Sequence, residues 1–431
     1  MRRAALAALM ATIASLSCTR ATVGPARGRI NASAGGEVER TGRGPRDASE
    51  RVVRILLSAR QQQVRLTADG GWRMYAADGV TLVSLPAPRE LWVLEREGTR
   101  VSARRDDSHA VPLRDSPVIV RPIDAGGTIT FDGKRWRGEL AISVSDGELL
   151  VVNRLRMDDY LRGVVPLEIG TSASTDAAAV EAQGVTARSY AVTHLTGGRR
   201  AYDMTATVQD QVYGGVNAET SVGNMSVEAT EGLVLLYDGS VVNAPYHANC
   251  GGFTAEPQDS WRASSEPYLR RVSDQIPGTD RFYCDQAPRF RWTRTFTGAE
   301  LRQSIERYVR TLPGGGGGVG AVTNVAVATV TPAGRVATLS VDTDRGHWSL
   351  RGNEIRSALR SAGGDLLYST YFSLEAVTGR SGVERLTLHG GGNGHGVGMC
   401  QSGAIGRARA GQDFRTILRT YYPGTTVGTI Q

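Results

Sequence analysis

Two glycine-rich segments carry polar side chains that could bind a ligand or a metal. One, His395–Ala404, holds a histidine, a cysteine and a glutamine between glycines, and the other, Tyr246–Thr254, holds a histidine and a cysteine before paired glycines. Glycine lets a backbone approach another backbone or a ligand closely. Both segments are poor in helix formers and too rich in glycine for an ordinary strand. We therefore expect each of them to form part of a site.

Histidine and cysteine in these segments suggest a metal site. His247, Cys250, Cys284 and Cys400 could together hold tetrahedral zinc, which accepts imidazole and thiolate ligands. In an exported protein a disulfide is the alternative, with Cys250 and Cys284 as the favoured pair and Cys400 left unpaired. A nucleophilic Cys/His dyad is a third interpretation, although no thiol-protease signature surrounds these residues. Spacing alone does not decide between zinc and a disulfide.

Glu168 is the carboxyl group best suited to acid–base chemistry. It follows Pro166, which is expected to end any regular structure, and it stands between Leu167 and Ile169. A carboxyl group in apolar surroundings loses hydration, so its pKa rises. A general acid that works near neutral pH needs a raised pKa. The alternative is an ordinary solvated glutamate on a loop.

A helix is predicted directly after this segment, over residues 176–195. The cluster Ser174–Asp176 supplies the N-cap, and small apolar residues recur along one face of the helix. Gln183 and Arg188 fall off that apolar face and are expected to look into a cleft. A surface or structural ion pair is the alternative for Arg188.

The remaining sequence predicts an α+β protein. Residues 51–140 form a β-rich N-terminal region of short alternating runs, and residues 141–428 form a mixed α/β domain. Asp146-Gly147 lies between two apolar runs and is the strongest hairpin signal in the chain. Residues 285–385 read as a small α+β unit that is appended to the mixed domain or inserted in it.

The first fifty residues predict export. Two arginines and a short apolar run end at Cys18, so residues 1–18 are typical of a signal peptide, and Cys18 resembles the lipidated cysteine of bacterial lipoproteins. Residues 19–50 have the composition of a flexible tether. We expect a protein of the cell envelope that contacts the membrane through a lipid anchor only.

Charge excludes some classes of partner. The net charge is +7, but residues 1–50 hold eight arginines against four acidic residues, which leaves about +3 for the rest. That balance is too weak for a nucleic-acid footprint and would suit a mildly anionic polymer. The chain has one lysine, Lys134, and no P-loop motif.

Six motifs in order give the chain a family resemblance. Between about residues 140 and 428 it resembles the SpoIID/LytB family, which is named for the stage II sporulation protein D lytic transglycosylase. The motifs that carry this resemblance are Val165–Ile169, Ala182–Ala191, Gln211–Gly215, Tyr246–Gly252, Gly394–Ala404 and Tyr421–Thr425.

The resemblance implies cleavage of peptidoglycan glycan strands, with a preference for strands that have lost their stem peptides. Glu168 matches the family's catalytic residue, and a 1,6-anhydro-N-acetylmuramic acid end would be the product. No cofactor is required, although some family members carry zinc near the Tyr-His motif. The resemblance also implies that the positions expected to line a glycan groove are Arg188, Tyr213, His247, His395 and Gln401.

The family name also implies a second function. LytB-type members suggest a non-catalytic module that binds peptidoglycan and stimulates an N-acetylmuramoyl-L-alanine amidase. A zinc- or thiol-dependent hydrolase built on the three cysteines is a third hypothesis.

Overall fold

The structure is a computed structural model that describes residues 51–105, 110–171, 173–261, 263–313 and 318–430. The predicted leader, tether and lipidation site at Cys18 lie outside these residues. Within the described ranges, no helix is both long enough and apolar enough to cross a membrane.

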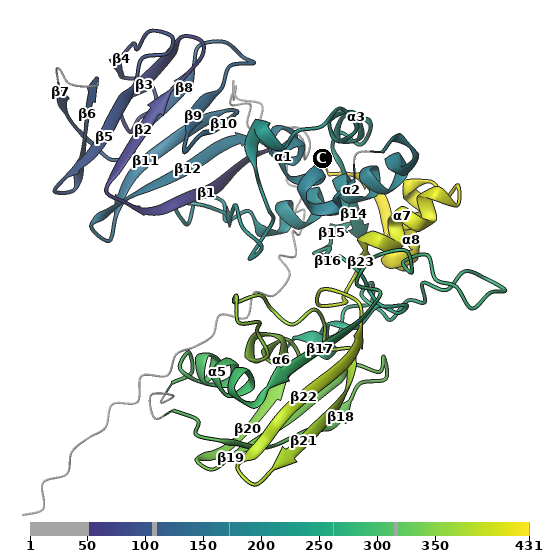
Figure 1. Cartoon of the computed structure of the whole chain (residues 1–431). Helices are drawn as coiled ribbons and strands as arrows, with labels where there is room; N and C mark the ends of the chain where they lie inside the picture. The colour runs from purple at the N-terminus through teal and green to yellow at the C-terminus, as the bar shows by residue number, and fades with distance from the viewer. Residues whose placement is uncertain (1–50, 106–109, 172, 262, 314–317, 431) are drawn as a thin grey trace, which may run out of the picture. The chain divides into compact units, whose positions relative to one another are not determined.

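Strands fill the N-terminal part of the chain, as the alternating runs predicted (Figure 1). They form a sheet in the order β13-β1-β12-β11-β8-β3-β4 and a second sheet in the order β10-β9-β2-β5-β6-β7. The strands are β1 (Val52–Gln61), β2 (Gln63–Thr67), β3 (Trp72–Tyr75), β4 (Leu82–Ser84), β5 (Trp92–Glu97), β6 (Arg100–Arg105), β7 (Ala110–Asp115), β8 (Val118–Pro122), β9 (Ile129–Phe131), β10 (Lys134–Trp136), β11 (Glu139–Ser145), β12 (Glu148–Arg156) and β13 (Met204–Thr205). The α+β class and the β-rich N-terminal part are therefore confirmed.

The predicted hairpin joins β11 to β12. Asp146 and Gly147 both have positive φ, 50° and 80°, which matches the twist of the flanking strands. The hairpin matters for the site because β12 runs directly into the first helix.

Helix α1 (Met157–Ile169) corrects the prediction for Glu168. Pro166 does not end the regular structure but lies inside the last turn, and Glu168 follows it within the same helix. The helix ends at Gly170, whose φ of 69° closes it with a bond from the Gly170 N–H to the Pro166 carbonyl. The Pro166 ring, which replaces a backbone donor, packs closely against helix α3 (Ser221–Ala229), where a Cβ on Gly223 would lie 2.8 Å from it.

Helix α2 (Ala177–His194) occupies nearly the predicted range and is buried on more than one face. Gln183 and Arg188 are both fully buried, so the expectation that they look into a cleft is wrong. Helices and strands surround α2, and the small residues on it allow this close packing. The remaining elements of this part are η1 (Ser174–Asp176), η2 (Gly215–Ala218), α3 (Ser221–Ala229), β14 (Leu233–Tyr237), β15 (Ser240–Val241), β16 (Tyr246–His247), α4 (Pro257–Ser260), β23 (Met399–Cys400), α7 (Gln401–Arg409), α8 (Phe414–Tyr421) and β24 (Thr426–Thr429).

One hydrophobic core joins the N-terminal strands to α1, α2 and the C-terminal segment, which includes Val397, Met399 and Tyr422. A second core belongs to residues between Trp292 and Leu388. Its elements are β17 (Arg291–Thr297), α5 (Gly298–Val309), β18 (Val322–Val330), β19 (Val336–Thr343), β20 (Gly346–Arg351), α6 (Asn353–Ala358), β21 (Phe372–Gly379) and β22 (Gly382–Gly391). We call this segment the inserted unit, because the chain leaves the first core before it and returns to that core afterwards.

Candidate active site

Glu168 lies half-buried at the C-terminal end of α1. Its Oε1 accepts a hydrogen bond of 2.6 Å from the backbone N–H of Val212, and the Tyr246 hydroxyl also hydrogen-bonds to its carboxyl group. The side chain before it, Leu167, is 45% exposed. Two distant motifs thus hold the carboxyl group while it keeps access to solvent.

Burial raises the pKa of Glu168 to about 7, as the apolar surroundings predicted. The hydrogen bonds from Val212 and Tyr246 oppose this rise but do not overcome it. The last turn of α1 contains no basic residue, and the negative end of the helix dipole disfavours a second negative charge there. A group with this pKa holds or releases a proton near neutral pH.

A directed chain of hydrogen bonds leads to this carboxyl group. The Tyr160 hydroxyl donates to the side-chain oxygen of Gln211 over 3.1 Å, because an amide oxygen can only accept. The Gln211 amide nitrogen then donates to the Tyr246 hydroxyl, also over 3.1 Å. The Tyr246 hydroxyl in turn interacts with the Glu168 carboxyl group and lowers its pKa. Burial raises the pKa of Tyr160 and Tyr246 well above the usual range, so both phenols stay protonated.

The two glycine-rich segments meet beside Tyr246. Strands β16 and β23 pair in parallel, with Tyr246 opposite Met399. The Nε2–H of His395 donates to the Tyr246 carbonyl over 2.8 Å, and its Nδ1 accepts from Val397 N–H, which fixes the tautomer of the neutral ring. Burial lowers the pKa of His395 to about 3. His395 therefore shapes the segment that carries Tyr246.

His247 lies on the buried side of the same ladder. Its Nδ1–H donates to the Val397 carbonyl over 3.1 Å, while its Nε2 is buried and has no hydrogen-bond partner among the described residues. Burial lowers the pKa of His247 to about 4, so the ring is neutral. Glycine permits the close contact of the two segments here, since a Cβ on Gly394 would lie 2.7 Å from the Cβ of His247.

Three other predicted groove residues are almost fully buried. The Tyr213 hydroxyl donates to the side-chain oxygen of Asn153 over 2.9 Å, and Gln401 donates to the side-chain oxygen of Gln183 over 3.2 Å. The Arg188 guanidinium pairs with Asp158 at 2.8 Å and also donates to the Leu233 carbonyl. These contacts are structural, so the geometry gives no support to glycan binding by Arg188 or Tyr213.

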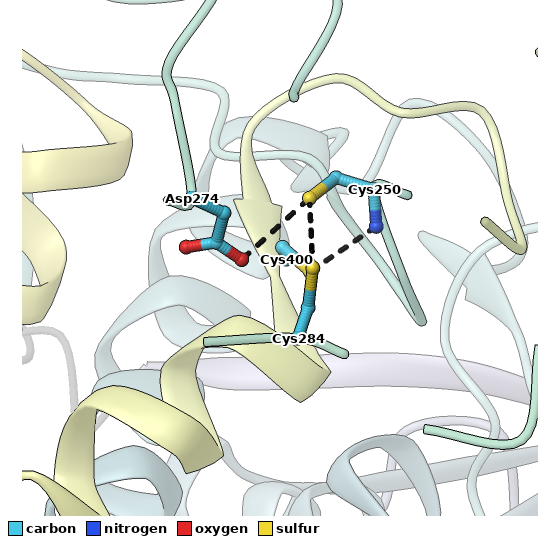
Figure 2. A group of neighbouring side chains, drawn as sticks. All are labelled: Cys250, Asp274, Cys284 and Cys400. Atoms are coloured by element: carbon cyan, nitrogen blue, oxygen red, sulfur yellow. Dashed lines mark hydrogen bonds between the residues drawn. The ribbon is translucent and has the colours of Figure 1, made fainter. Parts of the chain in front are cut away.

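Three cysteines converge at the other end of the β16–β23 ladder. Cys250, Cys284 and Cys400 are buried free thiols, and the Sγ atoms of Cys250 and Cys284 lie 3.5 Å apart (Figure 2). Asp274 completes the group, with its ligand oxygen and the three sulfur atoms all within 4.8 Å of one another. We call these four residues the cysteine cluster. His247 is not part of this group, whereas Asp274 is, and zinc binding by His247, Cys250, Cys284 and Cys400 stays a prediction.

The cysteine cluster fits zinc. Zinc–sulfur bonds of about 2.3 Å at tetrahedral angles place ligand atoms about 3.8 Å apart, and the four ligand atoms of the cluster lie within 4.8 Å of one another. One oxygen of Asp274 accepts from the Tyr421 hydroxyl at 2.7 Å and from Arg407 at 3.1 Å, while the other faces the Cys250 thiol at 3.6 Å. Metal-binding carboxylates are commonly held in this way through their second oxygen. A bound zinc would fix the segments after β16 and around β23.

Comparisons with known proteins find similar sequences over much of this chain. A family model described as "Stage II sporulation protein" matches residues 145–237, which include Glu168 and Val212. An amidase enhancer of Bacillus subtilis is 31% identical over 290 residues, which are 62% of this chain and 40% of that protein. The stage II sporulation protein D of Bacillus subtilis is 26% identical over 292 residues, 64% of this chain and 75% of that protein. These matches support the resemblance to the SpoIID/LytB family.

Two further matches extend beyond residues 145–237. An uncharacterized protein of Brachyspira hyodysenteriae is 27% identical over 302 residues, 69% of this chain and 73% of that protein. Residues 278–398 match a domain of unknown function (DUF8618), and this range contains the inserted unit. The "Stage II sporulation protein" match ends before Tyr246, so both glycine-rich segments lie outside it.

Sequence reasoning missed two functional residues. Tyr246 stands in a motif that drew attention to His247, and only the fold shows that its hydroxyl reaches Glu168. Asp274 has no distinguishing sequence context, since a single acidic residue ten positions before Cys284 predicts nothing by itself. The position of Tyr246 inside a family motif was its only sequence signal, and Asp274 had none.

Proposed function

We propose that this protein acts on the cell wall as a peptidoglycan lytic transglycosylase, with Glu168 as its single acid and base. The observation that carries the proposal is the Glu168 carboxyl group, which has a pKa of about 7, two hydrogen-bonded neighbours and partial access to solvent. Similarity to stage II sporulation protein D supports the same substrate class.

The proposed reaction needs only one carboxyl group. Glu168 donates its proton to the glycosidic oxygen between N-acetylmuramic acid and N-acetylglucosamine while the bond from that oxygen to C1 breaks. The Glu168 carboxylate then takes the proton of the muramyl 6-hydroxyl as that oxygen bonds to C1. The proton returns to Glu168, no water is consumed, and a 1,6-anhydro end forms. Two-carboxylate glycosidases differ because their second carboxylate activates water or attacks C1.

The surrounding residues would support both steps. Val212 N–H and the Tyr246 hydroxyl stabilise the carboxylate that forms after the first step. The chain from Tyr160 through Gln211 holds Tyr246 in the donating orientation. Removal of the proton-transfer group should slow the reaction about 100-fold or more.

The test is product analysis on glycan strands stripped of stem peptides. We expect 1,6-anhydromuramyl products from the wild type by mass spectrometry and a loss of about 100-fold or more in Glu168→Gln. Glu228→Gln on helix α3 is the matched control, because it makes the same change at an exposed glutamate. Equal product from Glu168→Gln and wild type would refute the catalytic role.

A second function has a specific observation in its favour. The relative named amidase enhancer shares the higher identity, 31%, although the match covers 40% of its length. A non-catalytic role would have this chain bind peptidoglycan and stimulate an N-acetylmuramoyl-L-alanine amidase. Amidase stimulation that is equal in wild type and Glu168→Gln, without anhydro products from either, would favour this alternative.

A further inference from the structure

The β17-β22-β21 sheet of the inserted unit carries a hollow that lies outside the candidate active site. One face of this sheet is buried in the second core, and the other is exposed. Because alternate residues of a strand share a face, Arg291 of β17 lies on the same exposed side as Thr293. His389 of β22 pairs with Thr293 on one side and with Ser373 of β21 on the other. These residues line a hollow of about 700 Å³, a size typical of small-molecule sites.

The hollow exists because the middle strand has no side chain at Gly391. This residue pairs with Arg291, and its N–H donates to the carbonyl of Tyr371, which directly precedes β21. A Cβ on Gly391 would lie 3.0 Å from Arg291 Nη1 and 3.1 Å from the Tyr371 ring. Any side chain there would fill the space between the two. Gly251 and Gly334 also approach the Tyr371 ring, since a Cβ on either would lie 3.2 Å from it. Backbone contacts therefore hold the ring in place.

Arg291 is held in place by one end of its guanidinium group. Nη1 donates to the carbonyls of Gly251 and Phe290 over 3.0 and 2.8 Å, and the guanidinium lies 4.0 Å above the Phe290 ring. The other edge, formed by Nε and Nη2, has no hydrogen bond to a described residue, and no described acidic side chain pairs with Arg291. Such an edge matches a carboxylate, which it can bind through two parallel hydrogen bonds. Because the group is already held, little side-chain entropy is lost on binding.

The other groups in the hollow suit a ligand with many hydroxyl groups. The Nδ1 of His389 lies 3.3 Å from the Thr293 hydroxyl, and Ser373 adds a second hydroxyl to the lining. The half-buried Tyr371 ring offers apolar area to the C–H groups of a sugar. No acidic residue is among the described lining residues, although Glu375 lies 3.9 Å from His389 Nε2 outside the lining. This combination favours a saccharide that carries a carboxylate.

We propose that this hollow is a separate glycan-binding site, in which Arg291 binds the free carboxylate of a peptide-free N-acetylmuramic acid residue and Tyr371 contacts its sugar ring. The choice of this polymer rests on the proposed function, whereas the need for a carboxylate rests on Arg291. N-acetylglucosamine has no carboxylate, and a stem peptide converts the carboxylate of muramic acid into an amide. Neither can form the paired hydrogen bonds. A strand that is held at two points on one chain dissociates more slowly than a strand held at one.

The experiment measures glycan affinity of the full chain by isothermal titration calorimetry. Every protein carries Glu168→Gln, so that no strand is cleaved during the titration. The probes are peptide-free glycan oligomers and the same oligomers with their carboxylates converted to neutral methylamides. The acid oligomers should bind about 10- to 100-fold more tightly than the amides. Adding Arg291→Met should remove this difference, because the variant loses the charge and both donors of the free edge.

Further variants separate recognition from folding. Arg302→Met removes an exposed arginine from helix α5 of the same unit and should leave the affinity unchanged. Ser373→Asp adds a negative charge at an exposed position in the hollow and should weaken binding of the acid oligomers by about fivefold, whereas Ser373→Asn should change it little. If Arg291→Met lowers the unfolding midpoint, the two Ser373 variants decide the proposal, because they leave the contacts of Arg291 with Gly251 and Phe290 intact.

Three outcomes would overturn the inference. Equal affinity for the acid and amide oligomers would exclude carboxylate recognition, and unchanged affinity in both Arg291→Met and Ser373→Asp would exclude the hollow. Tighter binding of poly(glycerol phosphate), lost in Arg291→Met, would assign the hollow to a phosphate polymer instead.

The inference and the proposed function can fail separately. Anhydro products from the wild type, together with affinity that does not depend on Arg291, would refute the inference alone. Arg291-dependent binding of the acid oligomers, without anhydro products from the wild type, would refute the transglycosylase and support the glycan-binding site.

Discussion

The β16–β23 ladder connects the Glu168 site to the cysteine cluster, but the ionisable groups of the two sites differ in their exposure to solvent. Glu168 is half-buried, keeps solvent access and is held by one backbone N–H and one phenol. The cysteine cluster is fully buried, and all four of its ligand atoms face one another. An open carboxyl group can exchange a proton with a substrate, whereas a closed group of ligands can only hold an ion or a covalent bond. This difference is why we propose proton transfer for Glu168 and a structural role for the cysteines.

The largest expected effect is the split between activity and stability at Glu168. Glu168→Gln should reduce glycan cleavage by about 100- to 10,000-fold and, at pH 5, where Glu168 of the folded wild type still holds its proton, leave the unfolding midpoint in denaturant near that of the wild type. The physical reason is that the amide keeps the size of the side chain but cannot transfer a proton. A large loss of stability would show that Glu168 has a structural role, as proposed for the cysteine cluster, and would contradict the contrast between the two sites.

Asp274→Asn should behave in the opposite way. It removes the partner of the buried Arg407 guanidinium, and breaking such a pair costs about 4 kcal/mol in the free energy of unfolding. Equilibrium denaturation of wild type and variant measures this difference. Arg121→Met, which breaks a more exposed ion pair in the N-terminal strands, is the control and should cost less than about 1 kcal/mol. A cost as small as that of the control would contradict the closed character of the cluster.

Arg188 tests whether a residue predicted to line the glycan groove belongs to the protein interior. Because it pairs with Asp158 in the interior, Arg188→Met should lower the free energy of unfolding by about 3 kcal/mol. The affinity of the remaining folded protein for glycan strands, measured by sedimentation with the polymer, should be unchanged. A selective loss of affinity for glycan without a loss of stability would show that Arg188 contributes to glycan binding.

The smallest effect concerns pH. Glu168 must be protonated to act first as an acid, so kcat/KM should be highest below pH 7 and fall above it. Tyr246→Phe removes a hydrogen bond that lowers the pKa of Glu168, so this descending limb should move to higher pH, with a loss of rate of about tenfold or less. If the descending limb of the kcat/KM profile stays at the same pH, the hydrogen bond between Tyr246 and Glu168 is excluded.

Stability should respond to the same proton. Burial raises the folded-state pKa of Glu168 from the ordinary 4.5 to about 7, so the folded state holds a proton that the unfolded state has lost between these values. The wild type should therefore lose stability relative to Glu168→Gln as the pH rises from 4.5 to 7, with little further change above it. Parallel denaturation curves at pH 5 and 8 measure the difference.

Local patterns in the sequence determined much of this protein. Alternation of apolar and polar residues predicted the N-terminal strands, Asp146-Gly147 marked its hairpin, and the N-cap cluster located α2 to within a residue at each end. Ordered motifs gave the SpoIID/LytB family and Glu168. These features depend on short-range backbone preferences or on the residue types at particular positions, and both can be read from the sequence without the fold. The functions of Glu168 and of the leader stay predictions.

Only the tertiary structure decided which side chains meet. Pro166 remains inside α1 because neighbouring helices pack against it, although local preference predicted the end of regular structure there. Arg188 turns inward to Asp158, Tyr246 reaches Glu168, and Asp274 joins three distant cysteines. Each of these contacts joins residues from separate segments of the chain, and its free energy depends on burial that no local pattern records. The fold therefore separates the residue that could transfer a proton from the residues that could hold an ion.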